Sequence, residues 1–419
     1  SKESFFKSDV VDFLKLRYSV GLLGSDDTRI WLWRQRYTFQ NGQGGVFGPG
    51  NPVAGIGLKM EASPNRNATW SDDFKQNIGI DARFLNNRLS TTIEGFYNKA
   101  TNILVNRVAS VPVTVGGSVA PENYGKSNYF GLELGLSWQD NIGSDITYGI
   151  STRLSWYENK IIQGDYNDAD LLYPWNSRPG VSGDIGKWGY DYMGMFKNQE
   201  EIDAYVSQYN ITSVFGTPVD QLRPGTFYYR DVRGSLRADG TFADPDGIID
   251  NNDQILLASK SSNHWGFGST LRFGYKGLNF ESVITGSWGG WSEMDGRTVL
   301  ERNIDNLYQN GVAYWADVYD PELNPNGKYP NPYFNAINLA PTSNFWKVNA
   351  FRMRIRNVNL NYSIPKHIVN KANVNSARIV FTVLNPINFY NPYTYRDADN
   401  AWDTYPILRT YSIGLNVSF

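Results

Sequence analysis

The chain has 419 residues and an almost balanced charge, with 39 Lys and Arg, 41 Asp and Glu and a net charge of −2. This balance argues against nucleic acid as a partner, because nucleic-acid-binding domains carry a strongly basic face. The absence of cysteine excludes a disulfide framework, a thiol nucleophile and a zinc ribbon.

Aromatic residues make up 15% of the chain, with 27 Tyr, 22 Phe and 13 Trp, while the mean hydropathy is −0.44. A helical membrane protein would contain runs of about 20 apolar residues, and the sequence has no such run. A polar chain rich in Tyr and Trp is typical of strands with a lipid face, a wet face and aromatic girdles at the membrane interfaces. The composition therefore favours an all-β membrane protein.

The first predicted strand covers residues 13–24, where large apolar residues alternate with small or charged ones. Successive side chains of a strand point to opposite faces, so Lys15 and Arg17 share one face and the apolar residues share the other. Because buried charges need partners, we expect Lys15 and Arg17 to face a water-filled lumen. A second strand is predicted over residues 30–39, and a glycine-rich loop over 41–50.

Three hairpins continue the alternating pattern. The first, over residues 78–97, turns at Asn86-Asn87, and because Asn tolerates positive φ we predict a tight primed turn there. The other two lie at 130–156, turning between 140 and 144, and at 265–284, turning at 275–277. Short turns on one side and long loops on the other are the expected asymmetry of an outer-membrane barrel.

A strand predicted over residues 347–364 contains a phase break, because its apolar residues change parity partway along. One extra residue at Arg356-Asn357 would restore the register, which predicts a β-bulge. With further strands over 376–385 and 406–419, the sequence predicts about a dozen strands in all. The sequence does not predict a βαβ unit. The last strand alternates strictly up to the aromatic terminal residue, as expected for the strand that closes a membrane barrel.

Two long loops interrupt the strands, at about 163–262 and 290–345. Loops of this length are rarely structureless in compact folds, so we expect them to be functional. A short helix is predicted near residues 198–208. Aromatic residues in the loops could stack on sugar rings or pack against a covering protein, or they could hold the loops together. As a set they favour a ligand-facing surface. The candidates are Trp175, Trp188, Tyr190, Tyr192, Trp291 and Trp315.

An acidic stretch at residues 244–253 has oxygen-bearing residues at a spacing typical of a calcium loop, with Gly247 at the turn. The pattern is imperfect, because the first ligand position falls on Phe242 and the last is Asp253 instead of Glu. The alternatives are a bound calcium ion and a solvated acidic turn. The candidate ligands are Asp231, Asp244, Asp246, Asp250 and Asp253.

Catalysis has little support in the sequence. Neither an H-E-x-x-H nor a G-x-S-x-G motif is present, and the two histidines, His264 and His367, are about a hundred residues apart. Paired carboxylates occur only in acidic loops, where a solvated turn is the default. We therefore predict that the protein is not an enzyme.

Several stretches, taken together and in order, resemble the C-terminal half of SusC/RagA-type TonB-dependent transporters of Bacteroidetes. They recur from the first predicted strand to the end of the chain. The most specific are 67–70 with 76–81 and 84–89, 123–126 with 130–133, 186–202, 224–232 with 246–253, and 354–365 with the terminal Phe419.

The resemblance implies that residues 1–419 supply roughly the C-terminal half of a 22-strand antiparallel barrel in a Gram-negative outer membrane. The N-terminal plug, the segment that contacts TonB and the first barrel strands are expected to lie outside this sequence. The implied function is import of a nutrient, either an oligosaccharide or a peptide. The implied partners are outer-membrane lipid, a SusD-like surface lipoprotein over the loops, and TonB, which would act through the missing part.

Two other functions stay open at this point. A transporter-like barrel could serve as a scaffold or accessory subunit of an envelope complex. Alternatively, the alternating strands could form a soluble all-β carbohydrate-binding or glycosidase domain.

Overall fold

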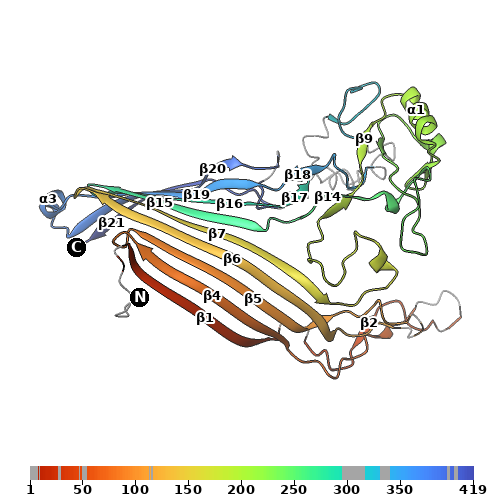
Figure 1. The fold of residues 1–419 in the computed structure, drawn as a ribbon, viewed down its shortest axis with the longest axis horizontal. Coiled ribbons are helices and arrows are strands. Elements are labelled where there is room, and N and C mark those ends of the chain that lie inside the picture. The colour runs from red at the N-terminus through yellow and green to blue at the C-terminus, as the bar shows by residue number, and fades with distance from the viewer. Residues whose placement is uncertain are drawn as a thin grey trace.

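The computed structural model describes residues 8–419 except 9, 27–29, 47, 50–53, 113, 115–116, 295–316, 331–339, 394–396 and 401–403. Within these residues, ten strands form one sheet in which neighbours follow each other in chain order and pair antiparallel. They lie side by side as a curved wall (Figure 1). In order they are β1 (Val11–Ser25), β4 (Ser71–Phe84), β5 (Leu89–Val105), β6 (Glu122–Ile142), β7 (Ile146–Gln163), β15 (Trp265–Tyr275), β16 (Leu278–Trp288), β19 (Arg352–Ser363), β20 (Ser376–Tyr390) and β21 (Thr410–Ser418).

The short turns lie at one end of the wall, near both termini, and the long connections lie at the other (Figure 1). Strand β15 passes to β16 through Lys276 and Gly277, whose φ values of 42° and 87° suit a two-residue primed turn. The turn at Asn86-Asn87 differs from the prediction. Phe84 pairs with Leu89, so four residues form the connection, and Leu85 joins the two asparagines in the left-handed region. The predicted asymmetry of the connections is confirmed.

The predicted bulge is present in β19. Val283 pairs with Asn357 and Ile284 pairs with Ile355, which leaves Arg356 as the extra residue. Apolar residues before and after the bulge therefore stay on one face of the sheet.

The two faces of the wall separate apolar from charged side chains. Leu14 and Leu415 are 40% and 63% exposed on the outer face, as expected for residues that contact lipid. On the inner face, Arg17 of β1 donates to Asp81 of β4 at 2.7 Å and to Glu94 of β5 at 3.1 Å. The inner face thus carries paired charges, as the alternation in the first strand predicted.

The prediction of a strand over residues 30–39 is wrong in its first half. The N–H of Arg34 donates to the carbonyl of Trp31 at 3.0 Å, and Trp31 has a φ of 65°, so a turn stands here. This turn buries Leu32 and leaves Ile30, Trp31 and Trp33 exposed. The second half of the predicted range contains the short strand β2 (Tyr37–Gln40), which pairs with β3 (Gly57–Met60) outside the wall.

Two other strand predictions need shorter bounds. The expected strand over 347–364 is divided into β18 (Lys347–Asn349), which pairs with β17 (Trp291–Glu293), and β19 in the wall. The last strand begins at Thr410 instead of residue 406. The bounds of these strands are set by backbone hydrogen bonds to the neighbouring strand, which the alternation of apolar and polar residues does not reveal.

The long insertion after β7 contains α1 (Gln199–Tyr209), close to the predicted helix. Asn198 caps it by accepting the N–H of Glu201 at 2.9 Å, and Asn210 ends it in the left-handed conformation. Two short helical segments, α3 (Lys366–Val369) and a 3-10 turn, follow β19 at the opposite end of the wall. Across the part of the chain that the structure describes, helices long and apolar enough to cross a membrane are absent.

Candidate functional site

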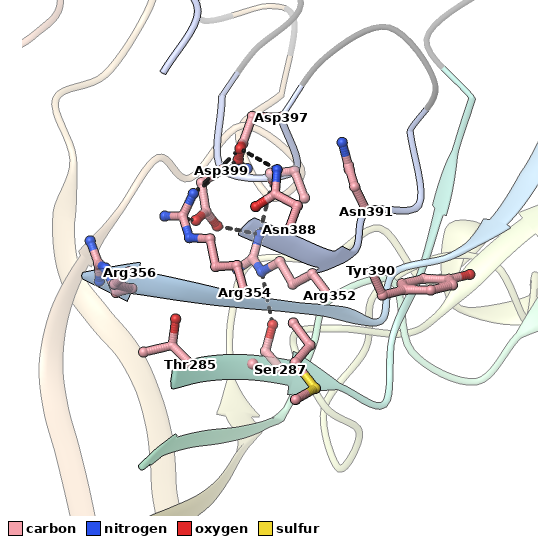
Figure 2. A pocket seen from close by; sticks show the side chains of 13 residues that line it. Thr285, Ser287, Arg352, Arg354, Arg356, Asn388, Tyr390, Asn391, Asp397 and Asp399 are labelled. Atoms are coloured by element: carbon pink, nitrogen blue, oxygen red, sulfur yellow. Dashed lines mark hydrogen bonds and ion pairs between the residues drawn. The ribbon is translucent and has the colours of Figure 1, made fainter. Parts of the chain in front are cut away.

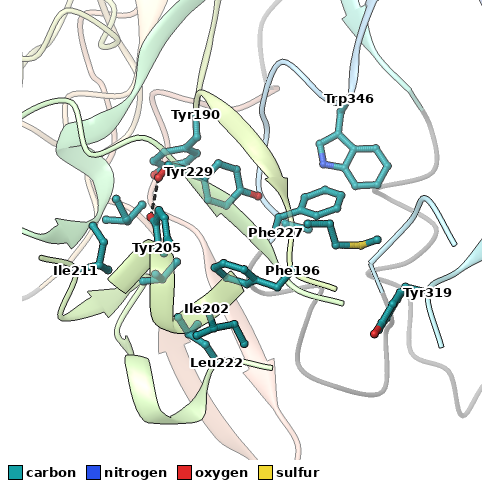
Figure 3. Packing of buried hydrophobic residues seen from close by; sticks show 14 residues of the cluster. Tyr190, Phe196, Ile202, Tyr205, Ile211, Leu222, Phe227, Tyr229, Tyr319 and Trp346 are labelled. Atoms are coloured by element: carbon teal, nitrogen blue, oxygen red, sulfur yellow. Dashed lines mark hydrogen bonds between the residues drawn. The ribbon is translucent and has the colours of Figure 1, made fainter. Parts of the chain in front are cut away.

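The two long loops fold into one layer with its own hydrophobic core, which we call the loop layer (Figure 3). Its fully buried side chains are larger than those between the wall strands, which bury few residues completely. The core consists of Tyr190, Met195, Phe196, Ile202, Tyr205, Ile211, Val214, Leu222, Phe227, Tyr229, Ile249, Tyr319, Ala340 and Trp346. The loop layer is therefore a folded body and not a set of independent excursions.

Short strand pairs tie the loop layer together. The pairs are β9 (Tyr192–Met195) with β12 (Phe227–Tyr229), β8 (Lys187–Gly189) with β14 (Ile255–Ala258), and β10 (Ser213–Val214) with both β11 (Thr217–Pro218) and β13 (Ile248–Ile249). The hydroxyl of Tyr205 on α1 donates to the carbonyl of Tyr229 at 2.6 Å, which joins the helix to β12 (Figure 3).

Four of the candidate aromatics fall into two groups. Tyr190 and Tyr192 belong to the core of the loop layer or pack against it, and burial raises the pKa of each phenol to about 12. Tyr192 meets Phe227 edge-on, with ring centroids 4.7 Å apart. This placement corresponds to the alternative in which loop aromatics hold the loops together.

Trp175 and Trp188 lie instead in a half-exposed cluster with Tyr173 and Phe242, which we call the aromatic platform. The ring of Trp175 lies 5.2 Å from that of Tyr173, 5.8 Å from Phe242 and 6.1 Å from Trp188. Arg233 extends over the rings of Phe242 and Trp175 at 5.1 and 6.0 Å. Sequence reasoning missed Tyr173 and Phe242, although Tyr173 stands two residues from a chosen candidate.

Two candidates remain. Trp291 begins β17, and the ammonium of Lys347 lies 4.3 Å from its ring centroid. Trp315 lies outside the described residues.

The acidic loop directs its carboxylates toward backbone N–H groups. Asp253 is fully buried and accepts from the N–H groups of Val232 at 2.8 Å, Arg233 at 3.2 Å and Asp250 at 2.8 Å. Asp231 accepts from Gly247 at 2.6 Å, and Gly247 has a φ of 78°, as the predicted tight turn requires.

The other acidic candidates are more exposed. Asp250 caps a 3-10 turn by accepting the N–H of Asn252 at 2.7 Å, Asp246 accepts that of Ile248 at 3.1 Å, and Asp244 is exposed. In the described part of the chain, three or more His, Asp or Glu side chains do not meet in a metal-holding arrangement. The calcium ion stays a prediction.

Asp253 predicts a pH dependence of the loop layer. Burial raises its pKa to about 6 despite the N–H groups that favour the charged form. A raised pKa contributes stability that is present below about pH 4 and is lost as the pH rises through about 6, here roughly 3 kcal/mol. We expect the unfolding midpoint, followed by tryptophan fluorescence, to fall over this window. Asp253→Asn should remove much of the fall, whereas Asp168→Asn, at an exposed aspartate, should not.

The same measurement tests the predicted ion. A cation favours ionised carboxylates, so bound calcium would raise the midpoint at pH 7 relative to a chelator. An identical midpoint with and without calcium would remove the ion from the acidic loop.

A second candidate region is a cavity of about 190 Å³ on the inner face of the wall (Figure 2). Arg354 pairs with Asp397 at 3.2 Å and also with Asp399, while Arg352 pairs with Asp399 at 3.1 Å. These contacts hold the connection between β20 and β21 against β19. The sequence signal was the three arginines at every second position of one strand, which sequence reasoning did not use.

The third arginine, Arg356, stands at the bulge. Figure 2 shows it at the edge of the cavity, away from the two aspartates. Among the residues that the structure describes, no ion pair to Arg356 is formed. The cavity therefore combines two neutralised arginines with one exposed cation.

These features define a class of protein. A wall of tilted antiparallel strands has an apolar outer face, a charged inner face, short turns at one end and a folded loop layer at the other. This arrangement is that of an outer-membrane β-barrel.

Comparison with known proteins narrows the class. The chain is 25% identical over 396 residues to the TonB-dependent receptor P26 of Formosa agariphila, covering 88% of this chain and 37% of that protein. It is 22% identical over 379 residues to the TonB-dependent receptor SusC of Bacteroides thetaiotaomicron, covering 85% of this chain and 32% of SusC. No family model matches the chain.

The fold is similar to that of the RagAB peptide transporter, with a TM-score of 0.70 and 17% identity over 99% of this chain and 42% of that one. Sequence and fold together support the identification of the chain as part of a SusC/RagA-type TonB-dependent transporter. The chain spans less than half the length of these relatives and covers about the C-terminal half of a larger barrel. These relatives are receptors and transporters. The localisation of this chain is the outer membrane.

Proposed function

We propose that this chain provides wall, lumen surface and capture loops for TonB-dependent import of an oligosaccharide or a peptide. The observation that carries the proposal is the folded loop layer at one end of a wall whose inner face is charged. A wall that served only as a scaffold would not need such a layer. The names of the relatives support transport, and RagAB is described as a peptide transporter.

We further propose that a SusD-like lipoprotein covers the loop layer and that TonB acts through a part of the protein outside this chain. The likeness to SusC and RagAB supports this partnership. Co-purification with a surface lipoprotein from the native membrane tests it. Purification with other envelope proteins alone would favour the scaffold function.

The aromatic platform is the proposed contact for the imported molecule. Aromatic rings offer large contact area at low entropic cost, and truncating such an anchor typically costs about 2 kcal/mol, or roughly thirtyfold in affinity. We therefore expect Trp175→Ala in the intact transporter to reduce uptake sharply at low substrate concentration. Slower growth on one of a panel of oligosaccharides and peptides, each supplied as the sole nutrient, would reveal the reduced uptake.

Leu323→Ala provides the control, because Leu323 is 88% exposed in the loop layer and lies outside the aromatic platform. Its uptake should equal that of the unmodified transporter. If Trp175→Ala also grows normally on every substrate that the unmodified transporter imports, the aromatic platform is not the contact.

A further inference from the structure

Four charged side chains meet where the loop layer joins the wall. Glu158 lies near the end of β7, Asp184 and Lys260 lie in the insertion, and His264 precedes β15. Their side chains are mostly buried, with exposed fractions of 14%, 12%, 24% and 8% respectively. We call them the rim cluster. It lies outside both the aromatic platform and the acidic loop.

Asp184 is an ionised acceptor. One carboxylate oxygen accepts from the N–H of Gly186 at 3.0 Å and the hydroxyl of Ser261 at 2.8 Å, and the other accepts from the N–H of Ser262 at 2.9 Å. Burial acts to raise the pKa of Asp184, but hydrogen bonds from Ser261, His264 and Gly186 outweigh it and lower the pKa below its usual range.

Both ring nitrogens of His264 face acceptors. Nε2 lies 3.0 Å from the second oxygen of Asp184, and Nδ1 lies 2.8 Å from the backbone carbonyl of Tyr157. A carbonyl oxygen and an ionised carboxylate can only accept hydrogen bonds. A neutral imidazole has one N–H and could satisfy only one of them. We infer that His264 is an imidazolium that donates to both.

The charges of the rim cluster support this protonation state. Lys260 pairs with Glu158, whose carboxylate also lies 3.8 Å from Nδ1 of His264 and accepts from the hydroxyl of Ser182 at 2.6 Å. With His264 charged, two acids face two bases. A neutral His264 would leave one excess negative charge in a mostly buried place, which is costly.

The imidazolium joins three segments of the chain. Tyr157 belongs to the wall, Asp184 stands at the start of the insertion before β8, and His264 stands at its end. The ring of Tyr157 also packs 5.4 Å from that of His264. His264 is thus a positioning residue that fixes both ends of the insertion to the wall. Removing either hydrogen bond loosens the attachment of the loop layer to the wall.

Hydrogen exchange of the intact transporter in detergent tests this inference. An imidazolium donates from both ring nitrogens, whereas a glutamine amide carries its N–H groups on a single nitrogen and cannot serve both acceptors. At pH 6, His264→Gln should therefore reduce protection of residues 180–190 by about tenfold relative to the unmodified transporter. His367→Gln, at an exposed histidine in α3, should leave the protection unchanged. Unchanged protection in His264→Gln would overturn the inference.

A measurement on the unmodified transporter covers the case in which His264→Gln does not fold. In ¹⁵N spectra at pH 6, the ring nitrogens of a charged histidine both carry protons. The signal of His264 is assigned through its hydrogen-bonded carbonyl at Tyr157. Two protonated nitrogens are expected, and a single neutral tautomer would refute the inference. Neither experiment depends on import, so its failure is distinguishable from failure of the proposed function.

Discussion

Replacing Phe227 with alanine is expected to unfold the loop layer while the ten-stranded wall stays intact. Phe227 is fully buried and contacts Tyr192, Phe345 and Trp346, with ring centroids 4.7, 4.7 and 5.8 Å away. Truncating a buried aromatic side chain leaves a cavity and costs about 3–5 kcal/mol. Because the core of the loop layer contains no wall residue, the cost should fall on the loop layer.

Limited proteolysis of the intact transporter in detergent measures this effect. Cleavage should increase within residues 190–350. The barrel itself should stay folded in detergent until the sample is heated, as in the unmodified transporter. Leu323→Ala removes a comparable apolar side chain from an exposed position and should leave the cleavage unchanged. Equal cleavage in the two variants would show that Phe227 does not support the loop layer.

Arg354→Ala is expected to release the connection between β20 and β21 from the inner wall. Arg354 is 12% exposed and its partner Asp397 is 15% exposed. Arg354→Ala removes the charge-assisted hydrogen bond to Asp397 from a mostly buried place, which costs about 2 kcal/mol. Proteolysis between residues 391 and 409 and the thermal unfolding midpoint would both report the loss.

Arg356→Ala is the matched control, because it removes the same side chain from the same strand. In the described residues Arg356 has no ion-pair partner, so its removal should change the midpoint little. If both variants lost the same stability, the pairs with Asp397 and Asp399 would not explain the effect.

Much of the wall could be predicted from the sequence, because strand alternation, turn residues and bulges are local properties. The parity change around Arg356 located the bulge without any partner strand. The same local logic failed at Trp31, where an apolar run that was predicted as a strand forms a turn and buries Leu32. Local pattern also did not show that Asn86 and Asn87 share their turn with Leu85.

The candidate site was predictable only as a set of residues. Period and composition placed aromatic side chains in the long loops, but Tyr190 is buried at 5% exposure while Trp175 joins a half-exposed cluster. The residue type is similar in both cases. Burial depends on which distant segments pack above each ring, and no local pattern encodes that.

The order of apolar and polar residues along the chain is sufficient to specify strands with one apolar and one polar face. The reason is that successive side chains of a strand point to opposite faces of the sheet. Partners come from chain folding: Arg354 finds Asp397 43 residues away, and His264 finds Asp184 80 residues away. Charge state, burial and contact at these places depend on atoms brought together across the sheet and the loop layer. For that reason the wall could be inferred in advance, whereas the loop layer and the rim cluster required coordinates.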